Sequence, residues 1–71
     1  MGRINVIGTT WCGHTTQQRL TLLEAGIKYN FIDNDKTPVK GVTGFPTLVC
    51  METKSFHPGE MSASEVQKMC P

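Results

Sequence analysis

The pattern of residues 1–33 constrains the fold more than any other feature of this sequence. β-branched residues dominate residues 3–8 and end at Gly8, which is typical of a strand. A helical period follows from about Cys12, and residues 28–33 then alternate and predict a second strand. A strand, a helix and a strand in about thirty residues predict a parallel βαβ unit with a right-handed crossover.

The helix in this unit is predicted to bury one apolar face. That face is spaced three and four residues apart and comprises Thr16, Leu20, Leu23 and Ile27. The polar face is predicted to carry Gln17, Gln18, Arg19, Thr21 and Glu24. Gly26 ends the pattern where a left-handed C-terminal cap is expected.

The remaining residues predict a hairpin and a second helix. Residues 34–44 contain prolines and glycines with little periodicity, so we expect a loop with at most one helical turn. Residues 47–51 and 54–57 predict two strands joined by a tight turn at Glu52-Thr53. Ser62 and Glu65 have the spacing of a capping box, which predicts a short helix at 63–69. The expected fold is a single α/β domain over residues 1–71, with the order β-α-β-loop-β-β-α and a mixed four-stranded sheet.

Charge and hydropathy exclude several classes of function. The 71 residues carry a net charge of +1 from seven basic and six acidic side chains, which are scattered singly. A nucleic-acid-binding protein needs a basic patch or stripe, so we expect no nucleic-acid partner. No apolar run approaches the roughly 18 residues that span a bilayer. We therefore expect a soluble cytoplasmic monomer without a membrane partner.

Cys12 is the residue that most directly indicates chemistry. It lies where the first strand passes into the first helix, and a thiol at a helix N-terminus faces free backbone N–H groups and the positive end of the helix dipole. Both favour the thiolate, which is the nucleophilic form of cysteine. His14 can add positive charge or a hydrogen bond. The alternative is an inert cysteine that packs as a small hydrophobic residue.

Three segments resemble the thioredoxin superfamily. Trp11-Cys12-Gly13-His14 resembles the first four residues of the site in protein disulfide isomerases. Residues 22–33 resemble the helix-to-strand passage of small glutaredoxins and of the glutaredoxin-like redoxins that serve ribonucleotide reductase. Gly44-Phe45-Pro46-Thr47-Leu48 is similar to the segment of this superfamily that carries a cis-proline. The resemblance implies a minimal thioredoxin-like fold of glutaredoxin type and a thiol–disulfide oxidoreductase.

The resemblance also implies roles for individual residues. Cys12 is the expected nucleophile and His14 its modulator, and both are assigned as catalytic. Glutathione is the expected co-substrate, and the partner is a disulfide-containing protein or a glutathione mixed disulfide. The residues expected to contact them are Trp11, Gly13, Thr15, Phe45, Pro46 and Ser62.

The sequence departs from the family at three places. Thr15 stands where the second cysteine of the dithiol motif is found, so an outside thiol such as glutathione has to resolve the mixed disulfide. Thr9 stands where many glutaredoxins have a lysine that contacts glutathione. The short segment between residues 33 and 46 shortens the second helix of the family to a turn or removes it. Lys36 or Lys40 can replace the missing contacts, although we expect solvated lysines.

The other candidate residues indicate structure. We expect Cys50 to be a core thiol and Cys70 to be exposed and unperturbed, and His57 to belong to a turn. An odd number of cysteines leaves at least one thiol unpaired. No paired Cys-x₂-Cys or His-x₃-His spacing is present, so we expect no metal site.

Two further functions fit the same residues. In the first, the domain has lost turnover and binds a peptide or protein through Trp11, Phe45 and Pro46. In the second, Cys12 holds an iron–sulfur cluster with glutathione, as in monothiol glutaredoxins with a Cys-Gly-Phe-Ser site. Here His14 replaces the Phe of that site.

Overall fold

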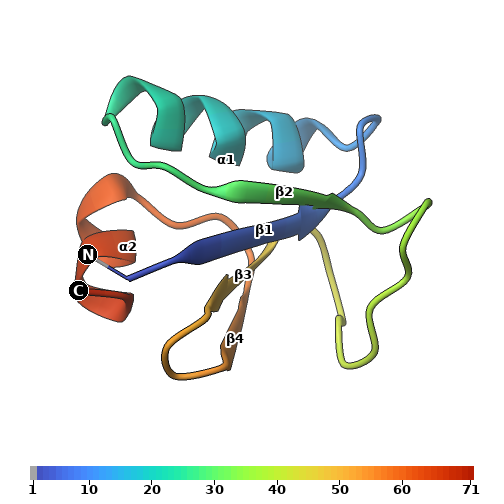
Figure 1. Cartoon of the computed structure of the whole chain (residues 1–71). Helices are drawn as coiled ribbons and strands as arrows, with labels where there is room; N and C mark the ends of the chain where they lie inside the picture. The colour runs from blue at the N-terminus through green and yellow to red at the C-terminus, as the bar shows by residue number, and fades with distance from the viewer. Residues whose placement is uncertain (1) are drawn as a thin grey trace.

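The computed structural model of the chain describes residues 2–71 and contains a mixed four-stranded sheet with two helices (Figure 1). The elements follow the order expected from the sequence, with boundaries that differ by one or two residues. They are β1 (Ile4–Gly8), α1 (Gly13–Glu24), β2 (Asn30–Asp33), β3 (Thr47–Cys50), β4 (Ser55–Pro58) and α2 (Ala63–Met69). Within residues 2–71, neither helix is long and apolar enough to cross a membrane.

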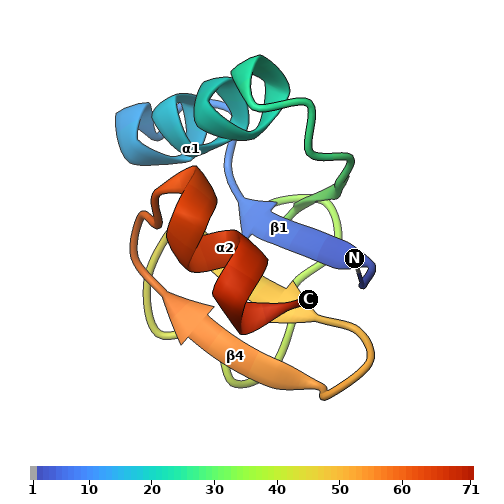
Figure 2. The ribbon, with the colours of Figure 1, turned by 90° about the vertical axis from the view of Figure 1, so that its left-hand side faces the viewer.

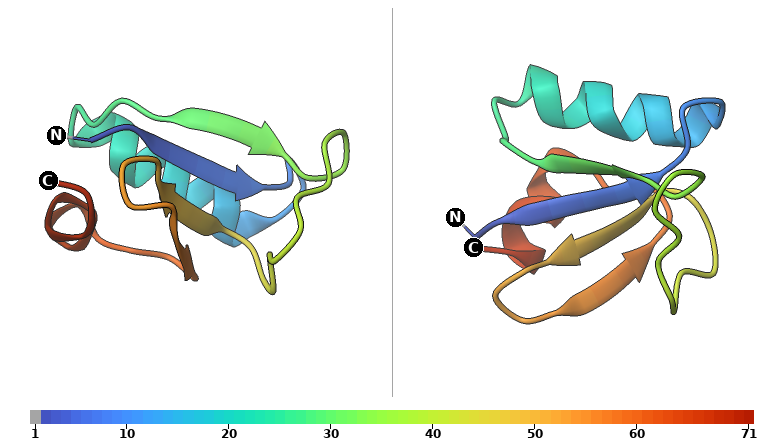
Figure 3. Two further views of the ribbon diagram at one scale, coloured as in Figure 1. Left: turned by 60° about the horizontal axis from the view of Figure 1, so that its bottom comes forward. Right: turned by 45° about the vertical axis from the view of Figure 1, so that its right-hand side comes forward.

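The strands lie in the order β2-β1-β3-β4, with β1 and β2 parallel and the other pairs antiparallel. Gly8 pairs with Asp33, Ile7 pairs with Thr47, and Thr47 pairs with Pro58. The ends of β1, β2 and β4 therefore meet the start of β3, and we call this the Gly8 end of the sheet. The loops that follow β1 and β2 leave from this end (Figure 3).

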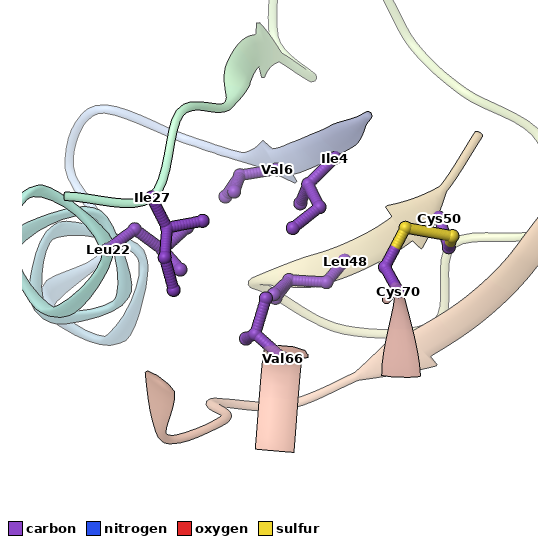
Figure 4. Close-up of a cluster of buried hydrophobic side chains, with 8 residues drawn as sticks. All are labelled: Ile4, Val6, Leu22, Ile27, Leu48, Cys50, Val66 and Cys70. Atoms are coloured by element: carbon purple, nitrogen blue, oxygen red, sulfur yellow. A yellow bond between two sulfur atoms is a disulfide. The ribbon is translucent and has the colours of Figure 1, made fainter. Parts of the chain in front are cut away.

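Both helices pack against one face of the sheet (Figure 2). Alternate residues of β1 and β3 point to this face, because side chains along a strand alternate between the two faces. They meet Leu22 of α1 and Val66 of α2 in one buried cluster (Figure 4). Its members are Ile4, Val6, Leu22, Ile27, Leu48, Cys50, Val66 and Cys70.

The buried face of α1 differs from the predicted one. Leu20 is 45% exposed and Leu23 is 70% exposed, whereas Thr15, Gln18 and Leu22 are buried. The Gln18 side chain donates to the backbone oxygen of Met61 at 2.9 Å and accepts from its N–H at 2.6 Å. These two bonds satisfy a buried amide that the hydrophobic period had assigned to the polar face. Of the predicted apolar face only Ile27 is buried, and Leu20 and Leu23 line a surface groove beside Tyr29.

The predicted helix ends are confirmed. Gly26 has φ +70°, and the N–H groups of Gly26 and Ile27 donate to the carbonyls of Leu23 and Leu22, which is the Schellman pattern. At α2, the Ser62 side chain accepts from the Glu65 N–H, and the Glu65 carboxylate accepts from the Ser62 N–H. This backbone N–H lowers the pKa of Glu65.

The loop predictions are confirmed in one case and wrong in the other. After β2, the N–H groups of Lys36 and Thr37 both donate to the Asp33 carbonyl, which makes a single helical turn in place of a helix. The β3–β4 loop is not a two-residue turn. It spans residues 51–54 and ends with Lys54 at φ +59°. The longer loop follows because Glu52 and Thr53 do not favour the positive φ that a two-residue hairpin requires.

Cys50 lies in the core, as predicted, but the predictions of free thiols at Cys50 and Cys70 are wrong. Cys70 is fully buried, and it forms a disulfide with Cys50, with a Cα–Cα distance of 5.4 Å. The reason is the path of α2, which returns over the sheet and places its last residues beside the end of β3 (Figure 4). Cys12 is the free cysteine.

Candidate active site

Cys12 caps the N-terminus of α1. Its backbone is extended, with φ −84° and ψ 120°, and its side chain is partly exposed. Gly13, His14 and Thr15 follow as the first three helical residues, whose N–H groups have no intrahelical acceptor. A side chain at this capping position faces the N–H groups of the second and third helical residues. The thiol therefore occupies the place where a helix stabilises a negative charge.

The helix end lowers the pKa of Cys12 below its ordinary value. The largest cause is the backbone N–H of Thr15, followed by the Thr15 hydroxyl, and the N–H of His14 acts in the same direction. Partial burial and the negative charge of Glu60 oppose this shift. No hydrogen bond of full capping geometry is formed by the side chain of Cys12. The N–H groups lower the pKa because hydrogen bonds to the thiolate favour the charged form.

The side chain of Thr15 is fully buried against Gly8. A methyl group on Gly8 would lie 2.5 Å from both Oγ1 and Cγ2 of Thr15, so the absence of a side chain at Gly8 makes room for this threonine. The Thr15 hydroxyl has no hydrogen-bond partner of full geometry among residues 2–71. Since no other acceptor competes for its proton, this hydroxyl is free to donate to the Cys12 thiolate when it forms.

Thr15→Val is expected to raise the pKa of Cys12. The substitution removes the hydroxyl but keeps the backbone N–H, so part of the pKa depression remains. At pH values where Cys12 is protonated, stability should not fall, because the buried hydroxyl that is lost then has no partner. Iodoacetamide alkylation against pH measures the shift, and Thr15→Ser, which keeps a hydroxyl, is the control. Superimposable profiles for the valine variant and the wild type would show that the hydroxyl does not act on the sulfur.

Two hydrogen bonds connect the Cys12 segment to neighbouring loops. Trp11 Nε1 donates to Oδ2 of Asp35, in the loop after β2, at 2.7 Å. His14 Nδ1 lies 3.0 Å from Oε1 of Glu60, in the loop after β4. The His14 ring therefore contacts Glu60, and it is the backbone N–H of His14 that acts on the thiol. Asp35 and Glu60 were not among the predicted site residues, because no local pattern reports contacts across 24 and 46 residues.

Glu60→Gln is expected to lower the pKa of Cys12 further and to speed its alkylation near neutral pH. The change removes the negative charge that opposes the thiolate and keeps an oxygen that can face His14. Glu24→Gln, at the exposed far end of α1, removes the same charge and is the control. The difference should shrink in high salt because salt screens exposed charges. An alkylation profile displaced to higher pH would contradict this assignment.

Phe45 and Pro46 lie at the Gly8 end of the sheet. The Phe45–Pro46 peptide bond is cis, and Pro46 is buried. Thr47, the next residue, pairs with Ile7, which places Pro46 opposite the end of β1. The Pro46 carbonyl accepts from Gly59. Within residues 2–71, the N–H and carbonyl of Phe45 form no backbone hydrogen bond.

The other residues discussed as contacts for a substrate or glutathione differ in exposure and in whether their polar groups are free. Trp11 is 72% exposed and presents an open indole face beside Cys12. Ser62 lies in the loop after β4, but its hydroxyl is engaged by the Glu65 N–H at 3.3 Å. Thr9 is fully buried, so this position, which is a lysine in many glutaredoxins, offers neither charge nor an exposed side chain here.

The site therefore combines a free thiol at a helix N-terminus, an unpartnered hydroxyl, an exposed indole and an unpaired peptide backbone. No protein-family model, curated protein or solved structure matches this chain.

Proposed function

We propose that this chain is a small thiol–disulfide oxidoreductase with a minimal thioredoxin-like fold of glutaredoxin type. One observation carries the proposal: Cys12 is free and partly exposed, and the end of α1 lowers its pKa. A thiolate at neutral pH is the reactive species in exchange with disulfides. The parallel β1–β2 pair, the two helices on one face and the cis Phe45–Pro46 bond support the proposed fold.

The reaction proceeds in two exchanges. The Cys12 thiolate attacks one sulfur of a substrate disulfide, a bond forms between the two sulfurs, and the other substrate sulfur leaves as a thiolate. A second thiol then attacks the mixed disulfide and releases Cys12 as thiolate. Glutathione is the proposed second thiol. These two exchanges leave glutathione bonded to the remaining substrate sulfur. When a second glutathione attacks that mixed disulfide, the substrate sulfur leaves as thiolate, so one disulfide has been reduced and two glutathione molecules have been oxidised to their disulfide.

The second exchange requires an outside thiol because the chain offers none near Cys12. Thr15 has no sulfur, and Cys50 and Cys70 are bonded to each other. They also lie at the opposite end of the sheet, since Cys50 pairs with Ile4 at the start of β1. Four residue-to-residue steps along β1 lead from Ile4 to Gly8, which is about 13 Å at the usual rise of a strand.

Turnover of a small mixed disulfide tests the proposal. Reduction of hydroxyethyl disulfide by glutathione should run faster with the protein than with glutathione alone, and Cys12→Ser should return the rate to that background. Thr15→Cys should in addition release substrate with dithiothreitol as reductant, because a second thiol is then one helical turn from Cys12. A wild-type rate equal to that of free glutathione would contradict the enzyme.

A peptide- or protein-binding module is the second candidate, and the exposed indole of Trp11 favours it. In this function Trp11 and the unpaired backbone of Phe45 hold an extended peptide, and Cys12 takes no part. The assay above separates the two candidates. Binding of a protein partner that survives Cys12→Ser, without turnover by the wild type, is the result that the module predicts.

A further inference from the structure

Three potential metal ligands meet at the end of the sheet that lies away from Cys12. The Cys50 and Cys70 sulfurs lie 3.8 Å and 3.7 Å from Oε2 of Glu52, and all three atoms lie within 4.8 Å of one another. Cys50 ends β3, Glu52 lies in the β3–β4 loop and Cys70 follows α2. Figure 4 shows the two cysteines meeting between the sheet and α2. We call these three residues the Cys50 cluster.

The N-terminal segment holds the carboxylate of the cluster in place. Oε2 of Glu52 accepts from the backbone N–H of Arg3 at 2.9 Å, and the Arg3 carbonyl lies 3.5 Å from the Cys70 sulfur. A side chain on Gly2 would collide with both the Glu52 carboxylate and the Cys70 sulfur, so the backbone lies directly against the cluster. Neither sulfur of a disulfide carries a proton. The Glu52 carboxylate therefore accepts no hydrogen bond from Cys50 or Cys70, although it lies close to both sulfurs.

The donor set matches the preferences of a thiophilic divalent cation. Zinc takes thiolate and carboxylate ligands in tetrahedral sites and binds sulfur at about 2.3 Å, which places two ligand sulfurs about 3.8 Å apart. Reduced Cys50 and Cys70 reach that separation when their side chains rotate, because their Cα atoms are only 5.4 Å apart. Both cysteines are buried, and Glu52 is exposed and gives the cluster one open side. A fourth ligand position is left for water.

We propose that the Cys50 cluster, in its reduced form, binds one divalent cation of the zinc type through Cys50, Glu52 and Cys70. Two outside thiols reduce the disulfide and leave as their own disulfide. The cation then replaces the two thiol protons, which pass to the solvent, and accepts the Glu52 carboxylate as third ligand. Oxidation of the two cysteines by a disulfide releases the cation. This site does not depend on the reaction of Cys12.

The short cysteine and histidine spacings of the sequence predict no metal site, because the three ligands do not lie in one short motif. Glu52 is two residues from Cys50, but Cys70 is 20 residues away and joins the cluster only through the path of α2. The pattern Cys-x-Glu is too common to indicate a site by itself. The tertiary fold supplies the third ligand.

Cobalt(II) titration tests the site directly. The protein is reduced and carries Cys12→Ser, so that the only thiols belong to the cluster. We expect one cobalt ion per chain, with a thiolate-to-cobalt charge-transfer band and the ligand-field bands of tetrahedral coordination. The oxidised form of the same protein should show neither. Absence of these bands in the reduced protein would overturn the proposal.

The Glu52→Gln variant tests whether Glu52 is a ligand of the cation or whether the two cysteine thiolates bind it alone. It keeps both sulfurs and should weaken cobalt binding at least about tenfold, since loss even of a residue that only orients a ligand costs 10- to 100-fold. Glu24→Gln, which removes an exposed carboxylate at the end of α1, should leave the affinity unchanged. Equal affinity in the Glu52→Gln variant and its parent would overturn the assignment of Glu52. Circular dichroism follows the fold throughout, and refolding of reduced protein on addition of cobalt would support the site, because metal binding then contributes folding free energy.

Discussion

Leu22→Ala is expected to lower the free energy of unfolding by about 2–5 kcal/mol, whereas Leu23→Ala should change it by less than about 0.5 kcal/mol. The two leucines are neighbours on α1, but Leu22 is fully buried in the core and Leu23 is 70% exposed. Removing Leu22 leaves a cavity between α1 and the sheet, while the side chain of Leu23 is mostly in contact with solvent already.

Urea unfolding of the two variants, followed by circular dichroism, measures this difference. The pair is a matched control, because the same atoms are removed from adjacent positions of one helix. The hydrophobic period of the sequence predicts the opposite order, since it placed Leu23 on the buried face. A larger loss at Leu23 than at Leu22 would show that α1 presents the face predicted by that period.

Replacing both Cys50 and Cys70 with alanine is expected to lower the free energy of unfolding by about 3 kcal/mol. The disulfide closes a loop with a sequence separation of 20, and the loss of chain entropy in the unfolded state on closing such a loop is of this size. The effect is large for this chain, because small domains have total stabilities of roughly 0.05–0.15 kcal/mol per residue. The disulfide also joins the end of α2 to β3, and it adds a covalent link to the packing of Val66 in the core.

Urea unfolding with and without dithiothreitol tests this prediction. The reductant should destabilise the wild type and Cys12→Ala by a similar amount and leave the double variant unchanged. Equal stability of the oxidised wild type and the double variant would contradict a structural role for the disulfide.

The features that sequence analysis placed correctly are those set by neighbouring residues. The β-branched run that ends at Gly8, the left-handed Gly26 and the capping box of Ser62 and Glu65 each depend on a few adjacent residues, and the structure confirms them. The parallel β1–β2 pair follows from the βαβ pattern, because strands joined by one helix run in the same direction. The position of Cys12 at the start of α1 follows from the same pattern.

The features that could not be predicted from the sequence depend on contacts between residues far apart in the chain. The local sequence of α1 does not decide which face of the helix is buried. The two hydrogen bonds between Gln18 and Met61, 43 residues apart, help to fix the face that packs against the core. Cys70 has no local signal of burial, because its position depends on where α2 packs. Glu60 reaches His14 only through the folded sheet, so its effect on Cys12 was not predictable from neighbouring residues.

The pKa of Cys12 is the quantity on which the proposed function depends. With Cys50 and Cys70 bonded to each other, Cys12 is the free thiol of the oxidised protein, so iodoacetamide alkylation reports on it alone. The rate of alkylation rises with pH as the thiolate forms, and its midpoint gives the pKa. A midpoint below the value of about 8.5 for an unperturbed cysteine is the result that a thiolate stabilised by the end of α1 predicts. A midpoint at or above that value would contradict it.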